Sequence, residues 1–107
     1  MDWVKLEEQR RFSAEKMVKA SLFETGRFFC DLYCFEPGQV QKPHSHFDSD
    51  KVYVVLEGQG RFQVGEEEQH LGAATAILAR AGVEHGVVNP GPGRLVVLVF
   101  MAPKPEH

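Results

Sequence analysis

After Gly26 the chain becomes a series of short apolar runs separated by turn residues, and this pattern restricts the fold more than any other feature. The runs are rich in Phe, Tyr, Val and Leu, whereas Gly, Pro and Asn stand between them. Such alternation is typical of many short strands joined by tight turns. We expect eight strands, at residues 27–35, 40–46, 52–57, 60–64, 69–71, 75–79, 85–89 and 95–101.

No helical repeat separates these runs, so a parallel sheet with crossover helices is excluded and an all-β antiparallel fold remains. Closing the strands into a jelly-roll barrel buries their inner faces and removes exposed sheet edges. A barrel of this size holds side chains or one small ligand. With 107 residues the chain forms one domain. We expect an N-terminal segment over residues 1–25, the barrel over 26–102 and a C-terminal tail over 103–107.

The N-terminal segment has one stretch of helical character, residues 13–22. Ser13 is a suitable N-cap, and Glu15 suits the first turn of a helix. Met17 and Ala20 form a modest apolar stripe at helical spacing. The sequence therefore predicts a short helix before the barrel.

Charge and hydropathy exclude several classes of partner. The net charge is −3 and the basic residues are scattered, so the chain has no basic face for nucleic acid. No apolar run approaches the roughly 20 residues that cross a bilayer. Residues 1–12 do not resemble a signal peptide, and we expect a cytoplasmic protein with no membrane partner.

The two cysteines fit the same compartment. On one strand, Cys30 and Cys34 would lie about 13 Å apart, which is too far for a disulfide. We interpret both as reduced residues of the core, as expected in a reducing environment.

Three histidines form the strongest candidate site. His44 and His46 stand two residues apart, so on a strand both imidazoles project from one face. His85 begins another predicted strand, and a third imidazole from there would complete a facial arrangement that borderline divalent metals accept. Taken alone, these residues also fit solvent-facing or core histidines. We interpret His70 and His107 as solvent-exposed.

The spacing of the glycines and histidines resembles the two motifs of the cupin family over residues 26–102. The residues that match the first motif are Gly38, His44, His46, Lys51 and Gly58. Those that match the second motif are Gly72, Gly82, His85 and Asn89.

The resemblance implies a double-stranded β-helix barrel, usually dimeric, with a metal held by three histidines and a carboxylate. By position, His44, His46 and His85 would be the histidine ligands. The cofactor would be a divalent transition metal: zinc, iron, nickel, copper or manganese. The sequence departs from the family pattern at Arg80, where proline is usual, and at Lys51, which takes the position of the carboxylate.

Strand alternation turns Lys51 and Tyr53 toward the barrel interior. An ammonium about 4 Å from a dication would be repelled by roughly 8 kcal/mol at an effective dielectric constant of 20. In the arrangement we favour, Lys51 extends to the rim and reaches water, which leaves a three-histidine site. In the second, a bulge lets Asp48 or Asp50 supply the carboxylate, although both also suit a polar loop. In the third, no metal binds, and a buried Lys51 of lowered pKa pairs with a carboxylate or acts as a base.

Alternation also places Asp31 and Tyr33 on one face of their strand, which makes Tyr33 a further pocket candidate beside Lys51 and Tyr53. A tyrosine at a barrel rim or a dimer contact is the alternative for Tyr33. Val52, Val54 and Leu56 would face outward and form an apolar surface that a second copy would cover, so we expect a homodimer.

The small single-domain members of the family include dioxygenases, isomerases and cyclase-like proteins. We therefore expect a metal-dependent enzyme acting on a small organic molecule, an oxidoreductase or an isomerase or cyclase. One alternative is a non-catalytic cupin that binds or senses a small ligand. The other is a structural dimer with a vestigial site, because a fold alone does not select a function.

Overall fold

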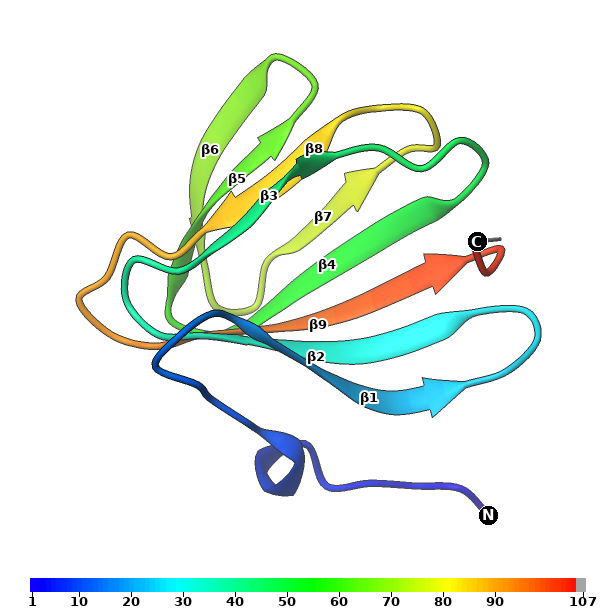
Figure 1. Ribbon diagram of the computed structural model, residues 1–107, viewed down its shortest axis with the longest axis horizontal. Coiled ribbons are helices and arrows are strands. Elements are labelled where there is room, and N and C mark those ends of the chain that lie inside the picture. The colour runs from blue at the N-terminus through cyan, green and yellow to red at the C-terminus, as the bar shows by residue number, and fades with distance from the viewer. Residues whose placement is uncertain (106–107) are drawn as a thin grey trace.

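The computed structural model describes residues 1–105, whose strands form two antiparallel sheets (Figure 1). The larger sheet has the strand order β1-β2-β9-β4-β7, and the smaller has the order β3-β8-β5-β6. The strands are β1 (Val18–Glu24), β2 (Phe29–Phe35), β3 (Val40–His44), β4 (Asp50–Glu57), β5 (Gln59–Val64), β6 (Glu67–Gly72), β7 (Ala76–Ala79), β8 (His85–Val88) and β9 (Leu95–Ala102). All eight predicted strands are present, with ends that differ by at most two residues. The all-β double-stranded barrel is thereby confirmed.

The core lies between the inner faces of the two sheets. Tyr33 of β2, Tyr53 of β4 and Val97 of β9 meet Phe62 and Val87 from the smaller sheet. Along β4, buried residues alternate with residues that keep some exposure, as expected of a strand with one face on the core. Each fully buried large apolar side chain stabilises the fold by about 1.5–3 kcal/mol. One end of this core carries the histidines.

The predicted helix at residues 13–22 is wrong. Its second half belongs to β1, which pairs antiparallel with β2 so that Val18 lies opposite Cys34. Ala20 and Leu22 of β1 both pack against the buried cluster on the outer face of the sheet, which contains Leu32 of β2. Their spacing of two residues is that of side chains on one face of a strand. Pairing with the edge of β2 therefore outweighs the weak helical propensity of the segment. The helical element observed in residues 1–105 is one 3₁₀ turn, η1 (Leu6–Gln9), and no helix there is long and apolar enough to cross a bilayer.

Two glycines make turns that the sequence predicts. Gly58 begins the β4–β5 hairpin with φ +83°, and a Cβ there would collide with the backbone oxygen of Arg94. Gly82 has φ +80° and reverses the chain shortly before His85. Both conformations strain any residue with a side chain, so glycine is required at each turn.

The outer face of the larger sheet carries an apolar row. The strand register places Cys30, Phe100, Val52 and Leu78 side by side across β2, β9, β4 and β7. Phe100 and Leu78 keep 40% and 44% of their surface exposed. Beyond this row, Phe12 of the N-terminal segment packs over the outer face of the sheet. Both cysteines are free and share β2. The prediction that both belong to the core is correct for Cys34 alone, because Cys30 is half-buried in the outer apolar row.

Candidate metal centre

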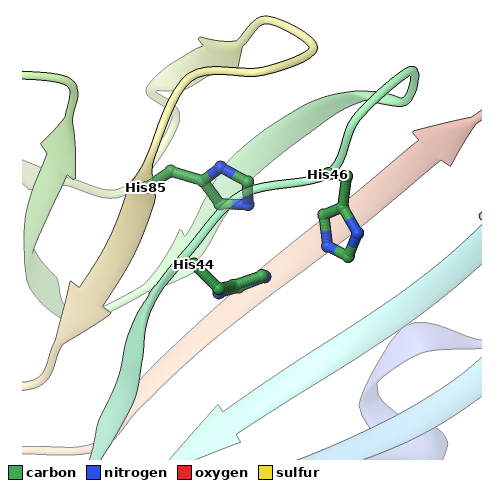
Figure 2. Close-up of side chains that lie close together, drawn as sticks. All are labelled: His44, His46 and His85. Atoms are coloured by element: carbon green, nitrogen blue, oxygen red, sulfur yellow. The ribbon is translucent and has the colours of Figure 1, made fainter.

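Three imidazoles converge at one end of the barrel. His44 ends β3 and His85 begins β8, and the two residues are direct partners in the pairing of these strands. His46 lies in the loop just past β3, and its ring turns toward the other two (Figure 2). The potential ligand atoms of all three side chains lie within 4.8 Å of one another. The structure thus brings together the three histidines that the sequence singled out.

Backbone carbonyls orient two of the rings. Nδ1 of His44 lies 2.9 Å from the carbonyl oxygen of Lys42, and Nδ1 of His85 lies 3.0 Å from that of Val83. A neutral ring that donates from Nδ1 keeps its lone pair on Nε2, which is the usual arrangement in a metal-binding histidine. Nε2 of His85 is buried and has no hydrogen-bond partner among residues 1–105. A buried nitrogen of this kind fits a metal ligand.

The electrostatic environment favours the neutral form of each imidazole. Burial lowers the pKa of His44 and of His46, and it lowers the pKa of His85 to about 4. The positive charge of Lys51 adds to the effect at each ring. Neutral imidazole is the form that binds metal.

Two hydrogen bonds hold the His46 loop against the loop that precedes His85. The backbone N–H of Gly82 donates to the carbonyl oxygen of His46, and the N–H of Ala81 donates to Oδ1 of Asp50, both at 2.8 Å. Asp50, the first residue of β4, therefore holds the loop that precedes His85, and Asp48 is exposed. Within the described residues the ligand group contains His44, His46 and His85 alone, and neither aspartate joins it.

A family model described as a cupin domain matches residues 31–101. This chain belongs to the cupin family. Three histidines positioned to bind a metal are thus part of a cupin barrel.

Solved structures agree with this assignment. TT1209 from Thermus thermophilus is 44% identical with a TM-score of 0.96, over 98% of this chain and 100% of that chain. An RmlC-like cupin protein from Desulfovibrio desulfuricans is 30% identical with a TM-score of 0.85, over 96% and 97%. A conserved protein with a double-stranded β-helix domain from Klebsiella pneumoniae is 24% identical with a TM-score of 0.89, over 96% and 90%, and it shares the fold. No curated protein matches the sequence.

Lys51 of this cupin does not reach water, so the arrangement that the sequence favoured is wrong. The side chain is fully buried, and Nζ lies 5.1 Å from the ring centroid of Tyr33 and 5.2 Å from that of Tyr53. Burial and the charge of Lys19 lower the pKa of Lys51 to about 7, against the opposing effect of Asp31. The amine can thus lose its charge, which reduces the expected repulsion. The arrangement around Lys51 resembles the third alternative, but no carboxylate pairs with Nζ among residues 1–105.

A pocket of about 600 Å³ opens beside His44 and His46. Other residues that line it include Lys19, Asp31, Tyr33, Gln41, Lys51 and Met101. Tyr33, one of the pocket candidates from the sequence, is thus among the lining residues. Tyr53, the other tyrosine candidate, does not line this pocket, and its hydroxyl donates to Oε1 of Gln41 at 2.9 Å.

Sequence reasoning missed Gln41, which lines the same pocket as His44 although alternation puts the two on opposite faces. The strand register shifts between these residues, so β3 does not alternate regularly. Pro43 was the available signal, because proline within a strand marks an edge or a bulge. β3 is indeed an edge strand of its sheet.

Gly86 is a second residue that the sequence did not single out. A Cβ at this position would lie 3.0 Å from the carbonyl oxygen of Gln41 and 3.1 Å from the nitrogen of Pro43. Both atoms belong to backbone, which cannot easily move away. The missing side chain thus lets β3 approach β8 where His44 and His85 face each other.

Proposed function

We propose that this cupin binds a divalent transition metal at His44, His46 and His85 and uses it to transform a small organic molecule in the adjacent pocket. The observation that carries the proposal is the buried Nε2 of His85, which lacks a partner among residues 1–105 and lies in the cluster of three imidazoles. Nitrogen ligands favour zinc, iron(II), nickel, copper and manganese over calcium and magnesium. The metal would act as a Lewis acid with open positions that polarises an oxygen of the ligand.

The residues of the chain have distinct parts in this proposal. The carbonyls of Lys42 and Val83 fix the rings of His44 and His85. The carboxyl of Asp31 lies in the same pocket, and burial raises its pKa. A carboxyl with a raised pKa suits proton exchange with a bound molecule. Asp31 is therefore our candidate for the group that holds or moves a proton.

A binding or sensing role without turnover is the second candidate. It is favoured by the ligand group itself, which within residues 1–105 consists of histidines and includes no carboxylate. His44 and His85 also form their side-chain hydrogen bonds to backbone carbonyls, which cannot exchange protons with a substrate. Such a protein would bind the same molecules in the same pocket and release them unchanged.

Cobalt substitution separates these candidates. The protein is treated with a chelator and loaded with Co²⁺ or Fe²⁺, and visible absorption of the cobalt form reports ligands that reach the metal. Oxygen uptake and product formation are then followed over a panel of enolic and catecholic compounds, with His85→Ala as the control. We expect metal-dependent turnover in the wild type and none in the variant. Spectral changes without product would support the binding role, and the absence of a cobalt spectrum would contradict the metal-dependent reaction.

We also propose that the protein works as a cytoplasmic homodimer. The free thiols of Cys30 and Cys34 suit a reducing compartment. The apolar row that contains Phe100 and Leu78 offers a surface that a second copy would cover.

A further inference from the structure

The pocket contains two buried nitrogen donors that lack acceptors. The side chain of Lys51 is fully buried, and Gln41 keeps 6% of its surface exposed. Both residues line the pocket beside His44 and His46. Neither Nζ of Lys51 nor Nε2 of Gln41 has a hydrogen-bond partner among residues 1–105. Buried donors normally find acceptors, so a bound molecule is the natural source of the missing ones.

The donor of Gln41 is held in a fixed orientation. The hydroxyl of Tyr53 donates to Oε1 of the amide at 2.9 Å, which leaves the NH₂ group as the free end. Tyr53 is itself fully buried, and its ring packs edge-on against Phe62 at a centroid distance of 5.5 Å. The amide therefore needs little reorganisation to receive an acceptor.

The environment of Lys51 is suited to an anion. The rings of Tyr33 and Tyr53 lie close to Nζ and attract a cation, but their attraction is weaker than that of a counter-ion. Asp31 shares the pocket, yet it lies beyond ion-pair distance, and Lys51 forms none of the ion pairs among the described residues. An ammonium buried without a counter-ion is costly, and a negatively charged ligand would remove that cost.

We propose that the molecule bound in this pocket carries a carboxylate, which Nζ of Lys51 and Nε2 of Gln41 bind while the rest of the molecule extends toward the three histidines. The inference rests on the proposed function, because it assigns a ligand class to the same pocket. One buried cation and two donor groups match a planar anion with a single charge and two oxygens. A phosphate dianion would need a second buried cation, whereas Lys19 and Lys42, which also line the pocket, are exposed.

The test compares ligands that differ in charge and hardly in shape. Binding of acetate, benzoate and malonate is measured by calorimetry and by amide chemical shifts, on metal-free and metal-loaded protein, with the metal content of each sample determined. Benzamide is the uncharged counterpart of benzoate, and phenylphosphonate is the counterpart with more charge. The variants are Lys51→Met and Gln41→Glu, and the exposed Lys16→Met is the matched control.

We expect the wild type and Lys16→Met to bind carboxylates at least about tenfold more tightly than benzamide, as is usual when a hydrogen bond to a charged group is lost. Lys51→Met loses this preference. Gln41→Glu also loses the preference for carboxylates, because its new carboxylate repels the ligand. That carboxylate can still accept the hydrogen bond from the hydroxyl of Tyr53. Chemical shifts of the variants show whether each one is folded, so the two variants test the inference independently.

Several results would overturn the inference. These are equal binding of benzoate and benzamide, no binding of any carboxylate, tighter binding of phenylphosphonate, and full benzoate affinity in folded Lys51→Met. If benzoate still binds to Lys51→Met, but only when the metal is present, the anion site is refuted and the proposed function is retained. Conversely, carboxylate binding that depends on Lys51 in a protein that takes up no metal would refute the proposed function and retain the anion site.

Discussion

His44 and His85 are direct partners in the antiparallel pairing of β3 with β8, and their ring centroids lie 4.4 Å apart. The register of two strands therefore sets the distance between two of the three candidate ligands. His46 depends on the same arrangement, because Gly82, near the start of β8, donates to its carbonyl oxygen. Changes that displace β3 from β8 should consequently act on metal binding before they unfold the barrel.

Gly86→Ala tests this dependence. The new methyl group would press on the backbone of Gln41 and Pro43, move β3 outward and separate His44 from His85. We expect metal affinity to fall by about 10–100-fold, the range typical of changes that misalign metal ligands. Competition with a chromophoric chelator measures this affinity. The control is Gly26→Ala, which adds a methyl group where no atom lies within 4 Å. Unchanged affinity in Gly86→Ala would contradict the role assigned to the strand register.

Lys51→Met should stabilise the metal-free protein and change how its stability depends on pH. Burial and the charge of Lys19 lower the pKa of Lys51 from its ordinary value of 10.5 to about 7, opposed by Asp31. Above pH 7 the unfolded chain therefore binds a proton that the folded chain lacks, so wild-type stability rises with pH. The rise is at most about 1.4 kcal/mol per pH unit for one proton.

The variant lacks this contribution, so we expect it to be more stable at pH 7 and to lose part of its advantage by pH 8.5. Urea unfolding with a chelator present measures the difference. The comparison stops at that pH because burial raises the thiol pKa values of Cys30 and Cys34, which opposes the trend at higher pH. Parallel stability curves for the two proteins would show that the ammonium of Lys51 is not desolvated.

Tyr53→Phe should weaken the fold and loosen Gln41. The variant removes the hydroxyl that donates to Oε1 of Gln41 and leaves a buried amide oxygen without that donor. We expect a loss of about 1–3 kcal/mol in the free energy of unfolding. A double-mutant cycle with Gln41→Met measures the coupling directly. Additive effects would mean that the two side chains do not interact.

The fold was largely predictable because the sequence features that indicate its strands and turns are local. Turn residues such as Gly58 and Gly82 mark the ends of strands, and the apolar runs between them match the observed strands within two residues. Residues 13–22 were misassigned to a helix because Lys, Glu, Ala and Met suit a helix, while the strand that begins at Val18 depends on pairing with β2. A preference created by a distant partner is invisible in a local pattern.

The site was predictable only in part for the same reason. His44 and His46 are close in sequence, and His85 stands at the start of another predicted strand, a position that the resemblance also supported. The position of Lys51 depends instead on the rings of Tyr33 and Tyr53, which the fold brings around Nζ from two different strands. Gln41 enters the pocket through an irregularity of β3 that side-chain alternation cannot reveal. These two residues are the ones on which the inferred anion site depends.

Phe100→Asp should disrupt the proposed homodimer. Phe100 is 40% exposed in the apolar row on the outer face of the larger sheet, next to Val52. A carboxylate there would be buried without a partner if a second copy covered the row. We expect the wild type to sediment as a dimer at micromolar concentration and the variant as a monomer. A wild-type monomer would refute the proposed dimer.

The metal content of protein purified without an affinity tag tests the central claim most directly. Inductively coupled plasma mass spectrometry is applied to the wild type, His44→Ala, His85→Ala and the control His70→Ala, whose histidine is exposed on β6. We predict about one transition-metal ion per chain in the wild type and in His70→Ala, and less than about a tenth of that in the other two variants. Equal metal content in all four proteins, or a wild type without a transition metal, would contradict the claim.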